Sequence, residues 1–484
     1  MAVCRFSVSK KYTPDHGDLL VFPFLDEKTP FFPEGLLPDF AQGVKAPEEQ
    51  GKSLTVLAGE HQGKRFVCRS IRLDDKTLSP GLVLKRHLSS FIGSSSDEKI
   101  KKVNVFLSKE RFDLVKDCQE AALLGGYKFD KYLEKKPELP EVVAFFEKTL
   151  SKNEKKEISD RERLFSWVNF ARDILNEPPN EIHPESLAGL FQKIGKKAGL
   201  KISVWDEKRL EKEKCGGILA VGKGASSRPR LVIGQYKPRK PRAFIAFVGK
   251  GVTMDTGGYC LKPAKSQMGM KYDMGGAAMT FAAACALASL KVPVHIVVIT
   301  PLVENDISSR AFHTQDIITM RNGKTVQVDN TDAEGRLILA DALCIASEMK
   351  PDCIIDAATL TGACVVALGE DIAGVFGPDR DFNNRLIDAG KSVDENLWEM
   401  PLFMPYMEQL KAEIADMKNI GSRWGGAITA ALFLKQFVDD DITWSHIDIA
   451  GPCVKEEPLG YLGKGAKGFG VKTLYEFVLN FKKG

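Results

Sequence analysis

Two acidic residues, Asp332 and Glu334, lie two positions apart in residues 330–337, which read Asn-Thr-Asp-Ala-Glu-Gly-Arg-Leu. The mostly apolar run that follows, residues 337–349, is long enough for a buried helix. The acids therefore precede a helix, and Arg336 lies in its first turn, where free N–H groups attract anions. An isolated Asp-x-Glu pair at a helix start is more often a cap than a ligand pair.

A second group of charged residues lies upstream and changes that interpretation. Lys250, Asp255 and Lys262 belong to a glycine-rich stretch after an apolar run typical of a buried strand, and Asp273 precedes Gly-Gly and another apolar run. Four clustered carboxylates repel one another unless cations neutralise them. Two divalent metal ions would do so, and such a pair can polarise a carbonyl group and activate a water molecule.

The octapeptide at residues 330–337 resembles the signature of the leucyl (cytosol) aminopeptidases. Residues 249–258, 261–263 and 272–276 are similar to the other active-site segments of that family. The resemblance extends from about residue 176 to the C-terminus. The sequence departs from the commonest family pattern at Met254, Tyr259 and Cys260. None of these is a ligand position, so the departures concern the shape of the pocket.

The resemblance implies an exopeptidase that releases N-terminal, leucine-like residues by attack of a hydroxide bridging two divalent metal ions per subunit. It implies that Asp255 and Glu334 bridge both ions, and the full ligand set is Lys250, Asp255, Asp273, Asp332 and Glu334. Manganese or zinc is favoured, with magnesium or cobalt as alternatives. A lysine must lose its proton before it can coordinate a metal.

The remaining catalytic roles also come from the resemblance. Lys262 is expected to stabilise the oxyanion of the tetrahedral intermediate, and Arg336 to hold a bicarbonate ion that serves as the base. In the alternative, Arg336 pairs with an acid such as Asp341 and only positions the loop. His446, within a predicted strand, is interpreted as a packed core residue. The pocket for the first substrate side chain is expected to include Met270, Thr359, Gly362 and Ala450.

Other classes of function fit the sequence less well. The Gly-Lys-Gly at residues 249–251 lacks the frame of a phosphate-binding loop, and the chain has no Gly-x-Ser-x-Gly elbow. Two alternatives stay open: another dinuclear-metal hydrolase, such as a phosphoesterase, and a DNA-binding regulatory scaffold of the same fold. A formal net charge of +4 on 484 residues gives no indication of DNA binding.

Composition indicates a cytoplasmic protein without a membrane segment. Ten scattered cysteines with no Cys-x-x-Cys are typical of reduced, buried thiols. The N-terminus has no apolar signal segment, and the most apolar stretch, residues 275–290, is shorter than the roughly 20 residues that span a bilayer. The resemblance implies peptide substrates and a homohexamer.

The length of the chain predicts more than one domain, and the pattern of elements predicts two α/β domains. Residues 1–150 are expected to form a small non-catalytic domain, 151–170 a connecting helix or linker, and 171–484 the catalytic domain. Within the first, apolar runs at residues 19–25, 66–68 and 103–107 suggest strands, while residues 109–124 and 141–150 are predicted to be helices.

In the larger domain, apolar runs predict strands that alternate with helical stretches. The predicted strands are residues 200–205, 230–233, 244–248, 295–300, 353–357 and 443–449. Such alternation predicts a mainly parallel, mixed sheet flanked by helices on both faces. The candidate ligands follow strands or precede helices, where open α/β sheets bind their ligands.

Overall fold

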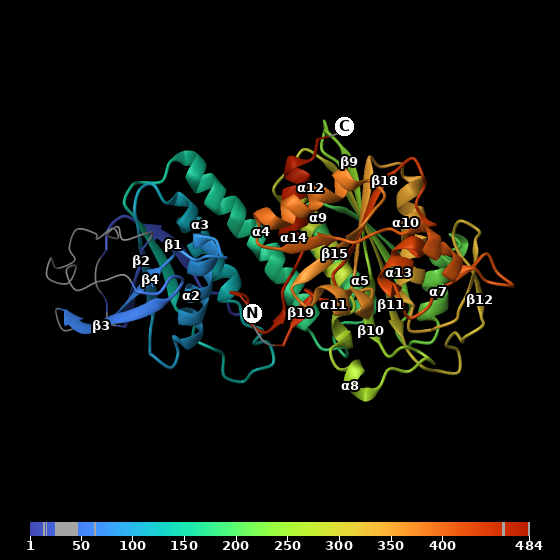
Figure 1. The fold of residues 1–484 in the computed structure, drawn as a ribbon, viewed down its shortest axis with the longest axis horizontal. Coiled ribbons are helices and arrows are strands. Elements are labelled where there is room, and N and C mark those ends of the chain that lie inside the picture. Colours follow the sequence, from blue (N-terminus) through green and yellow to red (C-terminus); the bar gives the residue numbers. More distant parts are fainter. Residues whose placement is uncertain (13–14, 16, 25–46, 62–63, 457–459, 483–484) are drawn as a thin grey trace. The chain divides into compact units, whose positions relative to one another are not determined.

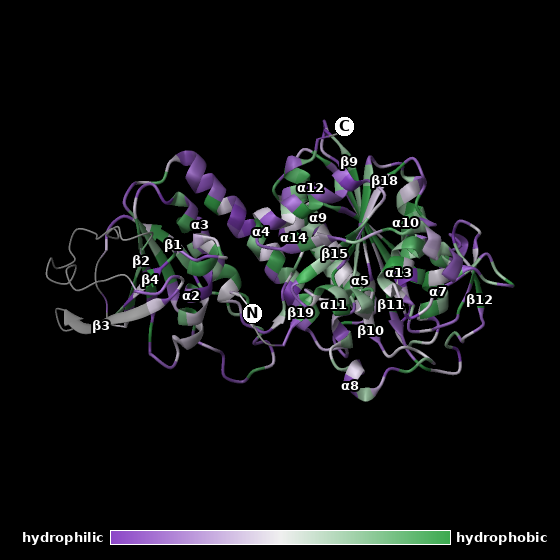
Figure 2. Cartoon of the chain, in the orientation of Figure 1, coloured by the Kyte–Doolittle hydropathy of each residue, from purple (hydrophilic) through white to green (hydrophobic). Residues whose placement is uncertain are grey.

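The computed structural model describes the chain except for residues 13–14, 16, 25–46, 62–63, 457–459 and 483–484 (Figure 1). The chain divides into two compact units, Met1–Asn169 with Glu456–Lys464, and Phe170–Lys455 with Gly465–Gly484. The helix α4 (Lys152–Asn176) contains the boundary between them, and its first half is strongly hydrophilic (Figure 2). Among the described residues, no helix combines the length and the apolar character needed to cross a membrane.

The smaller unit is built on a six-stranded sheet with the order β1-β6-β5-β2-β4-β3. Neighbouring strands are parallel except β3 and β4. Its strands are β1 (Phe6–Ser9), β2 (Asp18–Phe24), β3 (Ser53–His61), β4 (Lys64–Arg72), β5 (Lys102–Leu107) and β6 (Glu141–Phe146). Its helices are α2 (Pro80–Ser94), α3 (Phe112–Glu120) and a π-helical turn, η1 (Ala121–Gly125). The strand predicted over residues 19–25 corresponds to β2, and residue 25 itself lies outside the described residues.

The helix predicted over residues 141–150 is wrong, because Glu141–Phe146 forms β6 between β1 and β5. Val142 and Ala144 pack in the core beneath α2 and α3, whereas Val143 and Phe145 pack in a second cluster. Consecutive side chains point to opposite faces of a sheet, so this strand is buried on both. Burial on both faces removes the polar alternation that distinguishes a strand from a helix in sequence.

The larger unit contains a nine-stranded mixed sheet with the order β16-β15-β18-β14-β9-β11-β8-β7, and β10 pairs with β11 off this path. The central strands β18, β14, β9 and β11 are all parallel, whereas β7, β8 and the β15–β18 pair introduce antiparallel neighbours. The predicted fold class, with a mainly parallel mixed sheet, is therefore confirmed.

The strands of this sheet are β7 (Lys201–Trp205), β8 (Arg230–Tyr236), β9 (Phe244–Gly249), β10 (Gly251–Asp255), β11 (His295–Asn305), β14 (Cys353–Ala358), β15 (Ile372–Phe376), β16 (Asn396–Glu399) and β18 (Thr443–Asp448). The helices are α5 (Pro184–Ala198), α6 (Glu207–Lys212), α7 (Gly216–Gly222), α8 (Ala264–Gln267), η2 (Met270–Tyr272), α9 (Gly275–Ser289), α10 (Gly335–Glu348), α11 (Gly362–Leu368), α12 (Arg380–Ser392), η3 (Met404–Leu410), α13 (Gly426–Lys435) and α14 (Val471–Asn480). Two small sheets comprise β12 (Ile317–Thr319), β13 (Thr325–Gln327) and β17 (Met417–Lys418), and β19 (Val454–Lys455) with β20 (Gly465–Ala466).

Helices cover both faces of the large sheet (Figure 1). α10, α7 and α13 pack on one face, with Ala246 and Val248 of β9 in their core. α9 lies on the other face with α5, α12 and α14. Hydrophobic residues are concentrated on the central strands and on α9 and α10 (Figure 2). This packing buries the starts of α9 and α10, which carry acidic residues of the predicted site.

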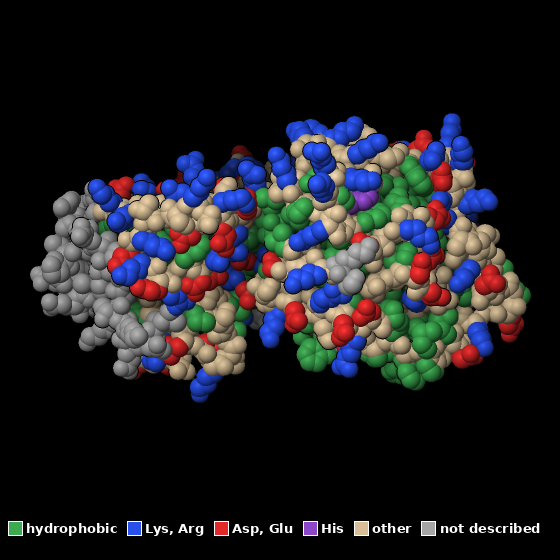
Figure 3. All heavy atoms as spheres, turned by 90° about the horizontal axis from the view of Figure 1, so that it is seen from above, with side chains coloured by type: hydrophobic (Ala, Val, Ile, Leu, Met, Phe, Trp, Pro, Cys, Tyr) green, Lys and Arg blue, Asp and Glu red, His purple; other side chains and the backbone are tan. Residues whose placement is uncertain are grey.

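The surface also exposes large apolar side chains. Figure 3 shows hydrophobic side chains in patches between charged groups of both signs. The exposed examples in the larger unit include Val366 at 90%, Met268 at 78%, Trp424 at 74%, Ile414 at 69% and Trp398 at 64%. Exposed apolar patches of this kind are candidates for contacts with another molecule.

Candidate active site

Three of the predicted site residues lie at the carboxyl ends of parallel strands. Lys250 follows β9, Asp255 ends β10, and Thr359 follows β14. Asp273 lies between η2 and α9, and Glu334 directly precedes α10. Because β9 and β14 are adjacent and parallel, their ends meet at one edge of the sheet, where α/β proteins bind ligands.

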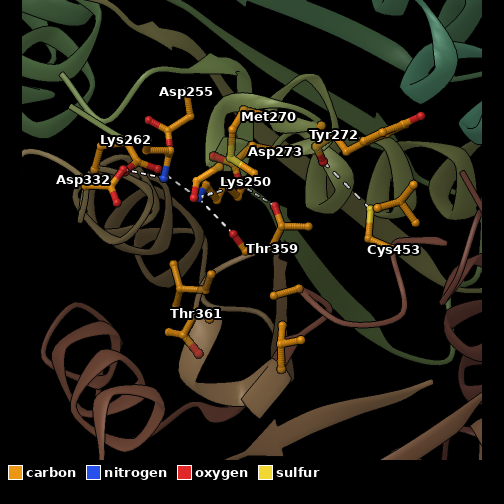
Figure 4. A pocket seen from close by; sticks show the side chains of 18 of the residues that line it. Lys250, Asp255, Lys262, Met270, Tyr272, Asp273, Asp332, Thr359, Thr361 and Cys453 are labelled. Carbon is orange, nitrogen blue, oxygen red and sulfur yellow. Dashed lines mark hydrogen bonds and ion pairs between the residues drawn. The ribbon is translucent and has the colours of Figure 1, made fainter. Parts of the chain in front are cut away.

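Lys250 lies at the centre of one half of the site (Figure 4). Its Nζ is 2.9 Å from Asp273 Oδ1 and 2.9 Å from Glu334 Oε1. It also donates a hydrogen bond to the Thr359 carbonyl at 3.0 Å. A Cβ at Gly335 would lie 2.6 Å from Lys250 Nζ, so the glycine of the octapeptide leaves the space that the lysine occupies.

Lys262 joins the acids of the other half. Its Nζ lies 2.8 Å from Asp255 Oδ2 and forms an ion pair with Asp332. The side chain of Asp332 is 30% exposed, whereas that of Asp255 is only 3% exposed. In total, four carboxyl groups face two ammonium groups, so ionisation of all four would leave two negative charges without a matching cation.

Three of these acids lie close enough together to hold a metal ion. One oxygen each from Asp255, Asp273 and Glu334 lie within 4.8 Å of one another, and all three residues are buried. Within the described part of the chain, Asp273 Oδ2 is buried without a hydrogen-bond partner. A buried acceptor without a partner is costly, and a divalent cation would satisfy it. Carboxylate oxygens suit manganese or magnesium, and mixed oxygen and nitrogen ligands also suit zinc.

The cluster perturbs the pKa values of its own members. Burial raises the pKa of Asp273 and of Glu334, and the charge of Asp255 adds to the effect. For Lys250 and Lys262, burial alone would lower the pKa, but the surrounding carboxylates outweigh it and raise the pKa of both. The two lysines therefore stay charged next to acids that resist ionisation, as expected for a cluster short of cations.

A cavity of about 520 Å³ opens beside the cluster (Figure 4). Its lining includes the six predicted residues Lys250, Asp255, Lys262, Asp273, Asp332 and Glu334. It also includes the four residues predicted for substrate binding, Met270, Thr359, Gly362 and Ala450. Sequence reasoning missed several apolar lining residues, among them Val365, Cys453 and Val454. The predicted ligands and the predicted substrate pocket thus share one cavity.

Asp448 was not predicted, yet it holds one wall of this cavity. Its Oδ1 accepts hydrogen bonds from the backbone N–H groups of Leu360 at 3.2 Å and Ala450 at 3.1 Å. Its Oδ2 accepts one from the Thr361 hydroxyl at 2.7 Å. Asp448 ends β18 beside the end of β14, where Ala358 is its partner in the ladder. Its only trace in the sequence is an acid between two isoleucines, which is too common a pattern to indicate a role.

Arg336 lies in the first turn of α10, as predicted, but is not among the residues that line the cavity. Its Nη1 donates a hydrogen bond to the Asn419 carbonyl at 2.8 Å, and burial lowers its pKa to about 10. Among the described residues, its Nε is buried without a hydrogen-bond partner. The alternative partner, Asp341, instead accepts hydrogen bonds from the backbone N–H groups of Ile218 and Arg321.

His446 is a core residue, as predicted, and is 1% exposed. Its Nδ1 lies 2.6 Å from Asp356 Oδ1, and Asp356 Oδ2 accepts a hydrogen bond from the Trp444 indole at 2.7 Å. Burial alone would lower the pKa of His446, but the Asp356 carboxylate outweighs it and raises the pKa. The pair lies between neighbouring strands, β14 and β18, and does not line the cavity.

Comparison with known proteins identifies the family of this chain. Residues 169–475 match the sequence model for the catalytic domain of the cytosol aminopeptidase family. The chain belongs to the cytosol aminopeptidase family. The probable cytosol aminopeptidase of Persephonella marina is 42% identical over 400 residues, which cover 80% of this chain and 80% of that protein. That of Streptomyces avermitilis is 46% identical over 363 residues, which cover 73% of this chain and 71% of that protein.

Solved structures of the bottromycin maturation enzyme BotP share the fold. One, in complex with Mn, has a TM-score of 0.82 and 28% identity, and the match covers 96% of this chain and 99% of that chain. A second has a TM-score of 0.83, 29% identity, and coverage of 97% of this chain and 100% of that chain. This member of the cytosol aminopeptidase family is therefore a metallo-exopeptidase with aminopeptidase activity, and the phosphoesterase alternative falls away.

Proposed function

We propose that this aminopeptidase releases leucine-like N-terminal residues from peptides and uses two divalent metal ions per subunit. The observation that carries the proposal is the group of Asp255, Asp273 and Glu334 oxygens within 4.8 Å of one another, beside a cavity of about 520 Å³. The BotP structure in complex with Mn supports manganese as one of the ions.

In this proposal five residues hold the metals. Asp255 and Glu334 would be ligands of both ions, Lys250 and Asp273 further ligands of one, and Asp332 a ligand of the other. When bound, the ions would polarise the peptide carbonyl and activate the attacking water. Lys250 would have to give up its proton, although the neighbouring carboxylates raise its pKa, so metal uptake should weaken at low pH.

Two cations of the chain would act on the reaction itself. Lys262 lines the cavity, and its side chain is 15% exposed, so its ammonium group can reach the substrate and stabilise the developing oxyanion. Arg336 would hold bicarbonate as the base, and its buried Nε together with the start of α10 supports an anion there. Because Arg336 does not line the cavity, this second role depends on a direct test with bicarbonate.

The preference for leucine-like residues is assigned to apolar and small residues that line the same cavity as the acidic cluster. Met270 supplies a long apolar side chain, while Gly362 and Ala450 are small and leave room for a branched substrate side chain. Thr359 connects this pocket lining to the acidic cluster, since its hydroxyl donates a hydrogen bond to Asp273 Oδ1 at 2.7 Å. One methylene group in such a pocket is worth about 1–3 kcal/mol of discrimination.

The test is hydrolysis of leucine-p-nitroanilide by the purified protein, before and after chelation and after addition of single metals. We expect activity to disappear with chelation and return with Mn²⁺ or Zn²⁺. N-acetyl-leucine-p-nitroanilide should be inert, because an exopeptidase binds the free α-amine. Inactivity with every divalent metal would contradict the proposal, and hydrolysis of the acetylated substrate would indicate an amidase or endopeptidase.

We further propose that the protein is a cytoplasmic homohexamer. The exposed apolar side chains of the larger unit, such as Trp424 and Val366, support contacts between copies. Sedimentation should therefore give a mass six times that of the 53.4 kDa chain. A species with the mass of a single chain at micromolar concentration would contradict this assembly.

A further inference from the structure

We propose that Asn305 is a positioning residue of the metal site, whose side-chain amide orients Asp255 and ties its loop to the loop that carries Asp332. The inference deepens the proposed function and rests on it. Asn305 touches neither cavity nor substrate in this assignment, because it is fully buried and is not a lining residue.

The amide of Asn305 holds one oxygen of Asp255. Asn305 is the last residue of β11 and faces Asp255 across the parallel β10–β11 ladder. Its Nδ2 donates a hydrogen bond to Asp255 Oδ1 at 2.9 Å, and the backbone N–H of Gly257 donates a second one, also at 2.9 Å. Asp255 Oδ1 is thus occupied by two neutral donors, whereas Oδ2 points to Lys262 Nζ at 2.8 Å.

Fixing Oδ1 leaves Oδ2 aimed into the cluster. A carboxylate on a free side chain could turn either oxygen away from its neighbours, and the nearby negative charge of Glu334 favours such a turn. Hydrogen bonds to a ligating side chain prevent this, and their loss typically costs 10–100-fold in metal affinity or activity. Asn305 supplies one of the two donors that prevent the rotation.

The same Nδ2 joins the two loops that carry ligands. Its second hydrogen bond goes to the Thr331 carbonyl at 3.0 Å, next to Asp332. The Thr331 hydroxyl donates to the Gly257 carbonyl at 2.6 Å and accepts from the Cys260 N–H at 2.8 Å. Two hydrogen bonds therefore join the loop after Asp255 directly to the segment that contains Asp332, and the Asn305 amide joins that segment to Asp255 itself.

The two loops are closely packed around Asn305. Gly258 has φ +61°, and a Cβ there would lie 2.9 Å from Asn305 Oδ1 and 3.0 Å from Thr331 Oγ1. Within the described part of the chain, Asn305 Oδ1 is buried without a hydrogen-bond partner. This oxygen has no partner because the amide is oriented so that its Nδ2 donates to both Asp255 Oδ1 and the Thr331 carbonyl. Only an amide offers two donors at this point without adding a charge beside Asp255.

The experiment compares two buried amides. Asn305→Leu keeps a similar volume but removes both donors. The matched control is Asn383→Leu, because Asn383 is also fully buried and also donates two hydrogen bonds, to Gly377 and Glu399, away from the cavity. Metal-free protein is titrated with MnCl₂, free Mn²⁺ is followed by electron paramagnetic resonance, and thermal unfolding is recorded without metal.

We expect Asn305→Leu to raise the Kd for Mn²⁺ about 10–100-fold, and saturating Mn²⁺ to restore part of kcat. Asn383→Leu should lower the unfolding temperature while leaving the Kd for Mn²⁺ at the wild-type value. Asn305→Ser keeps one donor, so its Kd for Mn²⁺ should lie between those of the wild-type protein and Asn305→Leu. It replaces the leucine variant in the test if that variant does not fold. Wild-type Mn²⁺ affinity in the folded Asn305 variants would overturn the inference alone. Failure of the wild-type protein to bind Mn²⁺ would overturn the proposed function and the inference together.

Discussion

The Lys262 ammonium nitrogen lies 2.8 Å from Oδ2 of Asp255, an acid proposed to contact both metal ions. The lysine that is expected to stabilise the oxyanion is therefore also a counter-ion of the metal site. Lys262 also lines the cavity, so its side chain adjoins both the acidic cluster and the space for substrate.

Lys262→Ala should bind metal with wild-type stoichiometry but turn over more slowly. Removing one oxyanion-stabilising donor costs on the order of 10²–10³-fold in kcat. Metal content and kcat for leucine-p-nitroanilide check this. Lys265→Ala is the matched control, since Lys265 is an exposed lysine three positions away that does not line the cavity. Wild-type kcat would remove Lys262 from the mechanism, and loss of metal would make it a ligand.

Glu334→Ala and Asp332→Ala should both lower metal content and abolish turnover. Glu334→Ala should lose more metal, because Glu334 is almost fully buried against Lys250, whereas the Asp332 side chain is 30% exposed. Metal content by mass spectrometry and rates at saturating Mn²⁺ separate the two variants. Asp329→Ala is the control, since the exposed Asp329 pairs with Lys418 at 3.6 Å and such pairs contribute little. Full metal content in both site variants would show that the metal site is misplaced.

Wild-type activity should fall in carbonate-free buffer and recover when bicarbonate is added. Arg336→Ala should lower kcat moderately and lose this response, because its planar guanidinium is the proposed contact for the anion. Arg336→Lys keeps the charge but not the planar fork, so it should respond only in part. Rates across a bicarbonate series, with unfolding temperatures recorded in parallel, check these outcomes. A wild-type enzyme indifferent to bicarbonate, with an Arg336→Ala variant that unfolds, would assign Arg336 to structure alone.

The contribution of Asp341 to the free energy of unfolding should decrease as the pH rises. Burial raises its pKa to about 7, although backbone N–H groups of Ile218 and Arg321 oppose the shift. An acid with a raised folded-state pKa binds more protons when folded. Its stabilising contribution is therefore complete below about pH 4 and is lost as the pH rises through about 7.

Asp341→Asn removes this titration and keeps an acceptor for one of the two backbone N–H groups, since Ile218 donates to Oδ2 and Arg321 to Oδ1. Unfolding temperatures of the wild-type protein and the variant, measured between pH 5 and 8, should diverge toward alkaline pH, with the variant becoming relatively more stable. A difference that does not change with pH would show that Asp341 is ionised in the folded protein throughout this range.

The residues of the octapeptide and of the glycine-rich stretch are sufficient to predict the acidic cluster from the sequence. Lys250, Asp273 and Glu334 come from three segments, yet each directly follows an apolar run or precedes one. Local patterns therefore predicted that they lie at strand ends and helix starts. Parallel strands bring their carboxyl ends to one edge, which explains why these residues meet.

The tertiary structure alone determined the features that no local pattern marks. Asn305 and Asp448 are single polar residues at the ends of apolar strands, and their roles depend on which loops lie beside them. The strand β6 looked helical because both of its faces are buried, which removes the alternation that identifies a strand. Arg336 was correctly predicted in the first turn of α10, but its absence from the cavity lining depends on packing around Asn419. Sequence spacing determines which residues share an element, whereas contacts between distant segments determine what each side chain faces.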